Sequence, residues 1–210
     1  IYIIEKEISV KHNPFKIVEM FEETVATYTG APFAVSVTSC TDALFLCCKY
    51  FEVSEVSIPA KTYLSVPQSI IHSGGKVKFT DEEWDGIYQL KPYPIYDAAK
   101  RFTSNMYVDG TNMCLSFHIK KHLKIGKGGM ILTDNKKLAD WVRVARYEGR
   151  NSVPYKEDDI TMLGWNMYMT PQQAAHGLAL MQNYPEHAPD LVEEGGYRDL
   201  REFTIFKGMQ

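Results

Sequence analysis

Short apolar segments alternate with helix-forming segments along most of this chain, and this alternation constrains the fold more than any other feature. The clearest example is an apolar strand predicted at 33–37, which a helix follows at 43–50. Further strands are predicted at 56–59, 76–79, 93–96, 113–117 and 130–133, and further helices at 14–28, 62–72, 134–147, 174–182 and 188–203. Strands that alternate with helices in this way favour an α/β fold with a mainly parallel sheet flanked by helices.

Composition is ordinary for one globular domain. The 210 residues are 45% hydrophobic and 23% charged, and the net charge of -3 gives no basic surface for nucleic acid. No apolar run reaches membrane-spanning length. The cysteines lack zinc-ligand spacing and are interpreted as free thiols of a cytoplasmic protein: Cys40, Cys47, Cys48 and Cys114. We therefore expect residues 1–210 to form a single compact domain without metal, nucleic-acid or membrane partners, with C-terminal helices at 170–210.

The segment 114–131 contains the densest group of candidate functional residues. Ser116 ends a short apolar strand, Lys120 and Lys121 follow it, and a glycine-rich turn leads into the next strand. A lysine fixed between two strands suits an amine that attacks a carbonyl group. Lysines beside such turns are more often solvated surface groups, so this pattern alone leaves both interpretations open.

Polar residues also follow two other predicted strands. Ser39 and Thr41 lie between a strand and a helix, where backbone N–H groups and hydroxyls can bind an anion. Either residue could instead be an ordinary N-cap. Asp97 ends an apolar strand, where parallel sheets place ligand-contacting groups, although it could also cap a helix.

Together, the hydroxyl-rich turn, the strand-end acid and the lysine loop resemble the DegT/DnrJ/EryC1/StrS family of sugar aminotransferases. Residues 116–129 match the family pattern Ser-Phe-His-x-x-Lys-x-Leu-x-x-Gly-x-Gly-Gly, and the resemblance extends over about 21–180. The family's members depend on pyridoxal 5'-phosphate (PLP) and have the fold-type I architecture. The resemblance implies a shortened member, in which 1–210 is the large PLP-binding domain and the C-terminal small domain is largely absent.

The resemblance implies two catalytic residues. Lys121, rather than the adjacent Lys120, corresponds to the lysine that forms a Schiff base with PLP. The same amine would later move a proton as general base and acid. Asp97 corresponds to the acid that pairs with the pyridinium nitrogen and keeps it protonated.

The resemblance also implies a set of cofactor contacts. Ser116 corresponds to a hydroxyl on the phosphate, and Tyr63 takes the place of the aromatic residue that stacks on the ring. Lys100 stands where the family usually has a Gln beside the ring hydroxyl, and Asn166 matches an Asn that reaches the phosphate of the partner subunit. The phosphate turn corresponds to Ser39, Cys40 and Thr41.

The function implied by the resemblance is amino transfer, with glutamate as the expected donor, to a keto group on a nucleotide-linked deoxysugar by a homodimer. Two alternatives stay open, a PLP-dependent sugar dehydratase and a non-catalytic cofactor-binding or dimerisation module. The family's dehydratases that lack an imine-forming residue carry His at the position of Lys121, which speaks against that variant.

The chain departs from the family pattern at several positions. Cys40 replaces a glycine, Lys100 replaces the Gln, and Tyr168 stands where the family has Arg. The segment 79–97 is short, and a strand–helix unit usually found there is missing. The cofactor-anchoring residues are therefore largely present, whereas the substrate-binding parts depart from the family, through Tyr168 and the C-terminal small domain that is largely absent.

Overall fold

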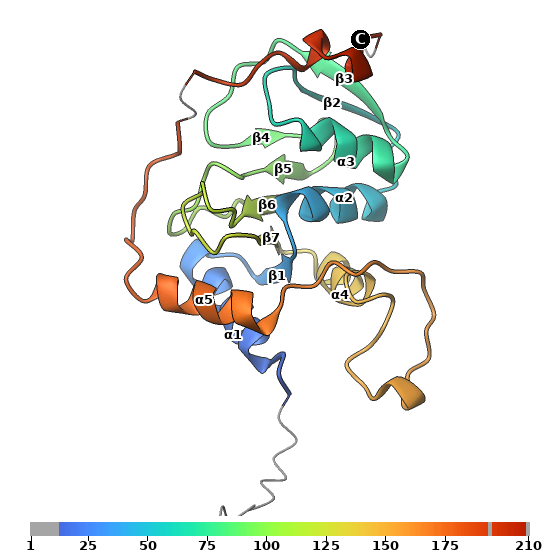
Figure 1. Cartoon of the computed structure of the whole chain (residues 1–210), viewed down its shortest axis with the longest axis vertical. Coiled ribbons are helices and arrows are strands. Elements are labelled where there is room, and N and C mark those ends of the chain that lie inside the picture. Colours follow the sequence, from blue (N-terminus) through green and yellow to red (C-terminus); the bar gives the residue numbers. More distant parts are fainter. Residues whose placement is uncertain (1–12, 193–194, 209–210) are drawn as a thin grey trace, which may run out of the picture.

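The computed structural model describes residues 13–192 and 195–208, which form an α/β fold (Figure 1). The central sheet has five strands in this order: β1 (Phe33–Val37), β7 (Gly129–Thr133), β6 (Asn112–Ser116), β5 (Ile95–Asp97) and β4 (Tyr88–Gln89). A second sheet pairs β2 (Glu55–Pro59) with β3 (Lys76–Thr80). An antiparallel bridge between Ser57 and Lys91 joins β2 to the chain just beyond β4. The second sheet therefore lies beside the β4 edge of the central sheet.

The sheet is mixed, which corrects the expectation of a mainly parallel sheet. Among the strands of the described residues, β5–β6 and β2–β3 alone pair in parallel, because β7 runs antiparallel to both β1 and β6, and β4 runs antiparallel to β5. Because β7 is antiparallel to both of its neighbours, β1 and β6 run in the same direction. The bridge to Lys91 likewise makes β2 point the same way as β5. The carboxyl ends of β1, β2, β5 and β6 therefore share one edge.

Helices cover both faces of the central sheet (Figure 1). One face packs against α1 (Lys16–Thr29), which in turn packs against α5 (Pro171–Met181). The other face packs against α2 (Cys40–Tyr50) and α4 (Lys136–Ala145), and α3 (Ser65–Ser73) lies between α2 and β3. Among the described residues, no helix is long and apolar enough to cross a membrane.

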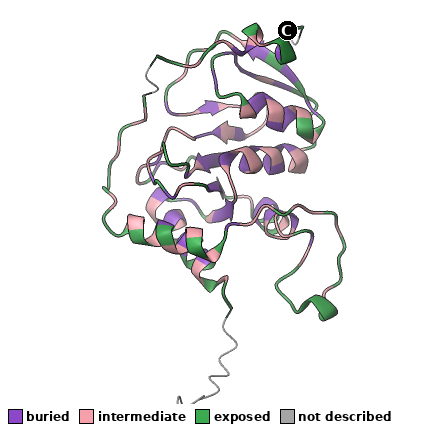
Figure 2. Ribbon diagram, viewed as in Figure 1, coloured by how far each residue is buried: buried purple, intermediate pink, exposed green. Residues whose placement is uncertain are grey.

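Alternating side chains of the strands build a separate core on each face, and Figure 2 shows the buried strands between their helices. Val35, Val37 and Ile131 pack with α2 and α4, whereas Met130 and Leu132 pack with α1 and α5. Successive strand residues point to opposite faces, so a strand buried on both faces is expected to be mainly apolar. β1 and β7 follow this rule, and their buried polar residues Ser36 and Thr133 are hydrogen-bonded to Glu22 and Asn112.

The C-terminal segment differs from the sequence-based expectation. The prediction of a helix at 188–203 is wrong, since the described residues there form no α-helix and only one short 3-10 turn, at Leu200–Glu202; a second 3-10 turn follows at Thr204–Phe206. Gly195 and Gly196, in the middle of this range, have positive φ values of 78° and 68°, which a right-handed helix does not contain. Asp190 instead forms a double hydrogen bond with Arg101, and the Leu200 N–H donates to the carbonyl of Ala60. Long-range contacts thus replace local helical ones.

A buried ion pair connects α1 to the end of α4. Glu22 is 5% exposed, and its Oε1 accepts hydrogen bonds from the backbone N–H and hydroxyl of Ser36, at 2.8 and 2.7 Å. The Arg146 guanidinium lies 2.5 Å from the same oxygen and also donates to the carbonyl of Ser36. Arg146 therefore links α1, β1 and the end of α4.

Removing Glu22 should destabilise the fold strongly. Glu22→Ala would leave the Arg146 charge, 13% exposed, without its partner, which costs up to about 3–5 kcal/mol, the value for a fully buried pair. We expect the urea midpoint of unfolding to fall accordingly. Glu23→Ala, at an exposed position of the same helix, is the matched control and should change stability little. Equal effects of the two substitutions would contradict this role for the ion pair.

Candidate cofactor site

A cavity of about 530 Å³ lies at the edge where β1, β2, β5 and β6 end. All the predicted site residues except Asn166 line it: Ser39, Cys40, Thr41, Tyr63, Asp97, Lys100, Ser116 and Lys121. These residues lie at the ends of strands and in the segments that follow them, at places distant in sequence. The common strand direction brings them together, as expected for the carboxyl edge of an α/β sheet.

Asp97 is the buried acid of this cavity, with 5% of its surface exposed. Its Oδ1 accepts the N–H of Ala99 at 2.9 Å, and its Oδ2 accepts the hydroxyl of Tyr88 at 3.0 Å. Burial raises the pKa of Asp97 above the usual aspartate value, while these hydrogen bonds and the charges of Lys121 and Lys100 lower it. A cationic ring nitrogen would add to the groups that favour the ionised carboxylate.

Tyr88 and Thr62 extend the network of Asp97, and the sequence interpretation missed both. Tyr88 is 4% exposed, and its hydroxyl lies 2.7 Å from the Thr62 hydroxyl. The segment 81–91 reads as polar and irregular, yet Tyr88 begins β4 and pairs across the hairpin with Asp97. Only the strand register brings the two side chains together, and no local pattern marks that register.

Of the two adjacent lysines, Lys121 is better placed than Lys120. Both line the cavity, but Lys120 is exposed and Lys121 is half-buried. The charge of Lys121 lowers the pKa of both Asp97 and Cys40. The Lys121 N–H also donates to the carbonyl of His118 at 2.8 Å, which forms a tight turn after β6. These observations favour Lys121 as the reactive amine.

The start of α2 forms the predicted anion site. Ser39 is the N-cap of α2, and its hydroxyl accepts the N–H of Asp42 and donates to the Asp42 carboxylate. Thr41 donates to the hydroxyl of Ser65, so the first turn of α3 lies beside the first turn of α2. Two helix starts and three hydroxyls at one cavity suit a phosphate group.

Gly129 and Cys40 determine how closely the elements around this site approach one another. A Cβ atom at Gly129 would overlap the backbone of Ser39 and Cys40, so only glycine lets β7 approach the start of α2 this closely. The Cys40 thiol, where the family pattern has glycine, points inward to the Cys114 carbonyl at 3.4 Å and lies 4.0 Å from Asp97. Burial raises the pKa of Cys40 well above its usual value, so this sulfur is a neutral wall of the cavity.

The outer wall combines aromatic and C-terminal residues. Tyr63 is 56% exposed at the cavity rim. The Lys100 ammonium lies 5.1 Å from the ring centroid of Trp84 and 5.4 Å from that of Tyr197. Leu191 lines the cavity too, and its N–H donates to the Lys100 carbonyl. The C-terminal segment therefore supplies part of the cavity wall.

Asn166 lies away from this cavity. It is exposed, its side chain donates to Glu148 at 2.8 Å, and its backbone bridges to Tyr147. A separate position is what the resemblance implies for a residue that serves the partner subunit. Its assigned contact with the phosphate of the partner subunit involves a second chain and stays a prediction.

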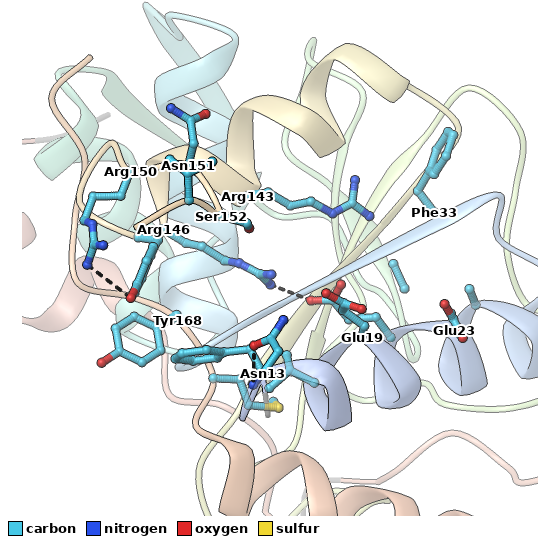
Figure 3. Close-up of a pocket in the computed structure, with 18 of the residues that line it drawn as sticks. Asn13, Glu19, Glu23, Phe33, Arg143, Arg146, Arg150, Asn151, Ser152 and Tyr168 are labelled. Atoms are coloured by element: carbon cyan, nitrogen blue, oxygen red, sulfur yellow. Dashed lines mark hydrogen bonds and ion pairs between the residues drawn. The ribbon is translucent and has the colours of Figure 1, made fainter. Parts of the chain in front are cut away.

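A second cavity of about 530 Å³ lies between α1 and α4 and contains none of the predicted site residues (Figure 3). Figure 3 shows Arg143 and Arg146 extending from α4 toward the side of α1 that carries Glu19 and Glu23. Tyr168 lies there as well, in edge contact with Phe15. Charges of both signs line this cavity, so it shows no preference for an anionic or a cationic ligand.

The residues of the first cavity fit PLP. The buried Asp97 suits the ring nitrogen, Lys121 suits the aldehyde, and the two helix starts suit the phosphate. Gly129 keeps the phosphate turn close to the lysine loop, at a place that any other side chain would fill. When bound, PLP supplies an electron sink; the protein supplies the lysine, the acid and the anion site.

The fold is that of the PLP-binding large domain of fold-type I transferases. Solved structures agree on the fold: Helicobacter pylori PseC, an aminotransferase involved in pseudoaminic acid biosynthesis, gives a TM-score of 0.68 at 20% identity, covering 80% of this chain and 58% of that one. The sugar aminotransferase CalS13 from Micromonospora echinospora gives 0.69 at 16% identity, covering 80% and 60%.

The sequence comparison is more specific. The model of the DegT/DnrJ/EryC1/StrS aminotransferase family matches residues 10–109 and 108–188, and the chain belongs to this family. It is 26% identical to the spore coat polysaccharide biosynthesis protein SpsC of Bacillus subtilis, over 77% of this chain and 55% of SpsC. It is also 26% identical to GDP-perosamine synthase of Caulobacter vibrioides, over 80% and 57%. The chain thus spans little more than half the length of these relatives.

Proposed function

We propose that this chain provides the cofactor-binding part of a sugar aminotransferase that transfers an amino group from glutamate to a keto group of a nucleotide-linked deoxysugar. The observation that carries the proposal is that Lys121 and Asp97 line one cavity together with the anion site at the start of α2. The names of relatives such as GDP-perosamine synthase support the substrate class.

The charge of the cavity supports an anionic substrate as well as an anionic cofactor. Among the described residues that line it are four lysines, Lys100, Lys120, Lys121 and Lys127, and one carboxylate, that of Asp97. One lysine would bond the aldehyde, which leaves a surplus of positive charge near the rim. A diphosphate linked to a sugar would neutralise that surplus.

The test is the visible absorption spectrum of the chain with PLP and then with glutamate. We expect a band from lysine-bound PLP, followed by its loss as the amino group passes to the cofactor in a slow half-reaction. A stable band that glutamate does not change would favour the non-catalytic module. Conversion of a sugar substrate without any amino donor would favour the dehydratase.

Full turnover needs groups that orient the sugar nucleotide, and positioning is worth several kcal/mol of the barrier. The relatives are longer than this chain, and Tyr168 stands where the family pattern has Arg. We therefore expect weak amination of a keto-sugar nucleotide by these 210 residues alone. Single-turnover kinetics of each half-reaction measure this difference directly.

We also propose that the functional unit is a homodimer, to which each chain contributes Asn166. A two-fold dimer would place this exposed amide near the partner's anion site and form two equal composite sites. Sedimentation of the PLP-bound chain should give a dimer. Asn166→Ala should weaken PLP binding, whereas Asn151→Ala, at another exposed position, should not. A stable monomer with full PLP affinity would contradict the proposal.

A further inference from the structure

Tyr88 contacts the proposed ring-nitrogen partner directly. Its Cα is the cross-strand partner of the Asp97 Cα in the β4–β5 hairpin, and its hydroxyl donates a 3.0 Å hydrogen bond to Asp97 Oδ2. The N–H of Ala99 donates to the other oxygen at 2.9 Å. One donor on each oxygen fixes the plane of the carboxylate, and each oxygen retains a lone pair for another partner.

The direction of the hydrogen bonds follows from counting protons. An ionised carboxylate only accepts, and the phenol has one hydrogen, so Tyr88 uses that hydrogen on Asp97. The Thr62 hydroxyl, 2.7 Å away, must then donate to the Tyr88 oxygen. Successive donors polarise one another in a buried site, so Thr62 strengthens the bond from Tyr88 to Asp97.

Tyr88 can act only as a neutral donor in this setting. Burial raises the pKa of Tyr88 well above the usual tyrosine value, and the charge of Asp97 acts in the same direction. Trp84 packs against the Tyr88 ring, with centroids 4.6 Å apart, and holds it in place. The phenol therefore stays protonated and directed at the carboxylate.

We propose, resting on the role of Asp97 proposed above, that Tyr88 is a positioning residue that keeps the proton shared by Asp97 and the ring nitrogen of PLP on the nitrogen. A hydrogen-bond donor to a carboxylate reduces its affinity for a proton. Without the phenol, the shared proton would move toward Asp97, and the ring would withdraw electrons less strongly. The short hairpin that ends in Asp97 thus supplies both the acid and the group that tunes it.

The test uses the chain loaded with PLP that carries ¹⁵N at the ring position, since the nitrogen chemical shift reports protonation directly. In Tyr88→Phe, we expect the signal to move from the protonated toward the unprotonated position. We expect kcat of the half-reaction with glutamate to fall roughly 10- to 100-fold, the value of a hydrogen bond to a charged group, with little change in KM. Thr62→Val should shift the signal in the same direction by less.

Tyr93→Phe is the matched control. Tyr93 follows β4 in the same hairpin, but its hydroxyl accepts the N–H of Ser54 at 2.9 Å, away from Asp97. This variant should keep the wild-type nitrogen signal, and thermal unfolding of every variant reports the fold separately.

Three results distinguish the inference from the proposed function. An unchanged nitrogen signal in a folded Tyr88→Phe variant, with a shift in Asp97→Asn, would overturn the role of Tyr88 alone. If Tyr88→Phe does not fold, Thr62→Val decides, and an unchanged signal there overturns the proposal. An unprotonated nitrogen in the wild-type chain would instead remove Asp97 from its assigned role.

Discussion

Lys121→Arg is expected to lose covalent attachment of PLP and to lower the rate of the half-reaction with glutamate by about 10⁴-fold or more. A guanidinium cannot form the bond to the aldehyde, and the general-base role of the amine alone is typically worth 10²–10⁴-fold. Borohydride reduction of the PLP-bound wild-type chain, followed by peptide mass mapping, should place the pyridoxyl group on Lys121.

Lys120→Arg is the matched control for this substitution. Lys120 is the adjacent residue and lines the same cavity, but it is exposed whereas Lys121 is half-buried. We expect this variant to keep both the covalent bond and most of the rate. A pyridoxyl group found on Lys120 or Lys100 would refute the assignment of Lys121.

Asp97→Asn is expected to lower kcat by roughly 10²- to 10³-fold, comparable to the loss of one preorganised electrostatic partner. A neutral amide cannot hold the ring nitrogen protonated. PLP binding should largely survive, because the phosphate and the aldehyde contact other residues. The control is Asp85→Asn, at an exposed position before the hairpin. A near-wild-type rate at saturating PLP in Asp97→Asn would exclude this role.

The affinity for PLP should depend on pH, because Asp97 is a buried acid. Burial raises the pKa of Asp97, so its carboxylate takes up a proton at a higher pH than an exposed aspartate does. The affinity for PLP should therefore fall as the pH decreases through this raised pKa, because the protonated acid cannot pair with a cationic ring nitrogen, and Asp97→Asn should lose that dependence. The Asp85→Asn control should retain it.

The local parts of the fold were predictable from sequence because their signals are local. Strand β1 and helix α2 follow from an apolar run, a hydroxyl cap and a helical pattern in adjacent residues. The site residues could be identified for a related reason, since each lies at or after the end of a strand and its neighbours match a family pattern. Eight of them, from four strand ends, line one cavity, while their roles stay predictions.

The parts that failed depend on contacts between distant segments. Two reversed strands, β4 and β7, make the sheet mixed, and no single segment encodes the direction of its neighbours. The extended path of 188–192 depends on Arg101, which pairs with Asp190 from a distant part of the sequence. Tyr88 is the clearest case, because its partner Asp97 is defined only by the register of a two-residue strand.

The contact between Gly129 and the turn at Ser39 has a consequence for how this site can change over evolution. Backbone meets backbone there, so a substitution at Gly129 would separate the phosphate turn from the lysine loop and affect every cofactor contact at once. A side chain is accommodated at position 40 of the same turn, since the Cys40 thiol points toward the Cys114 carbonyl. Substitutions at position 40 can therefore change the surface of the cavity beneath the PLP ring, while Gly129 keeps the distance between the phosphate site and Lys121 fixed.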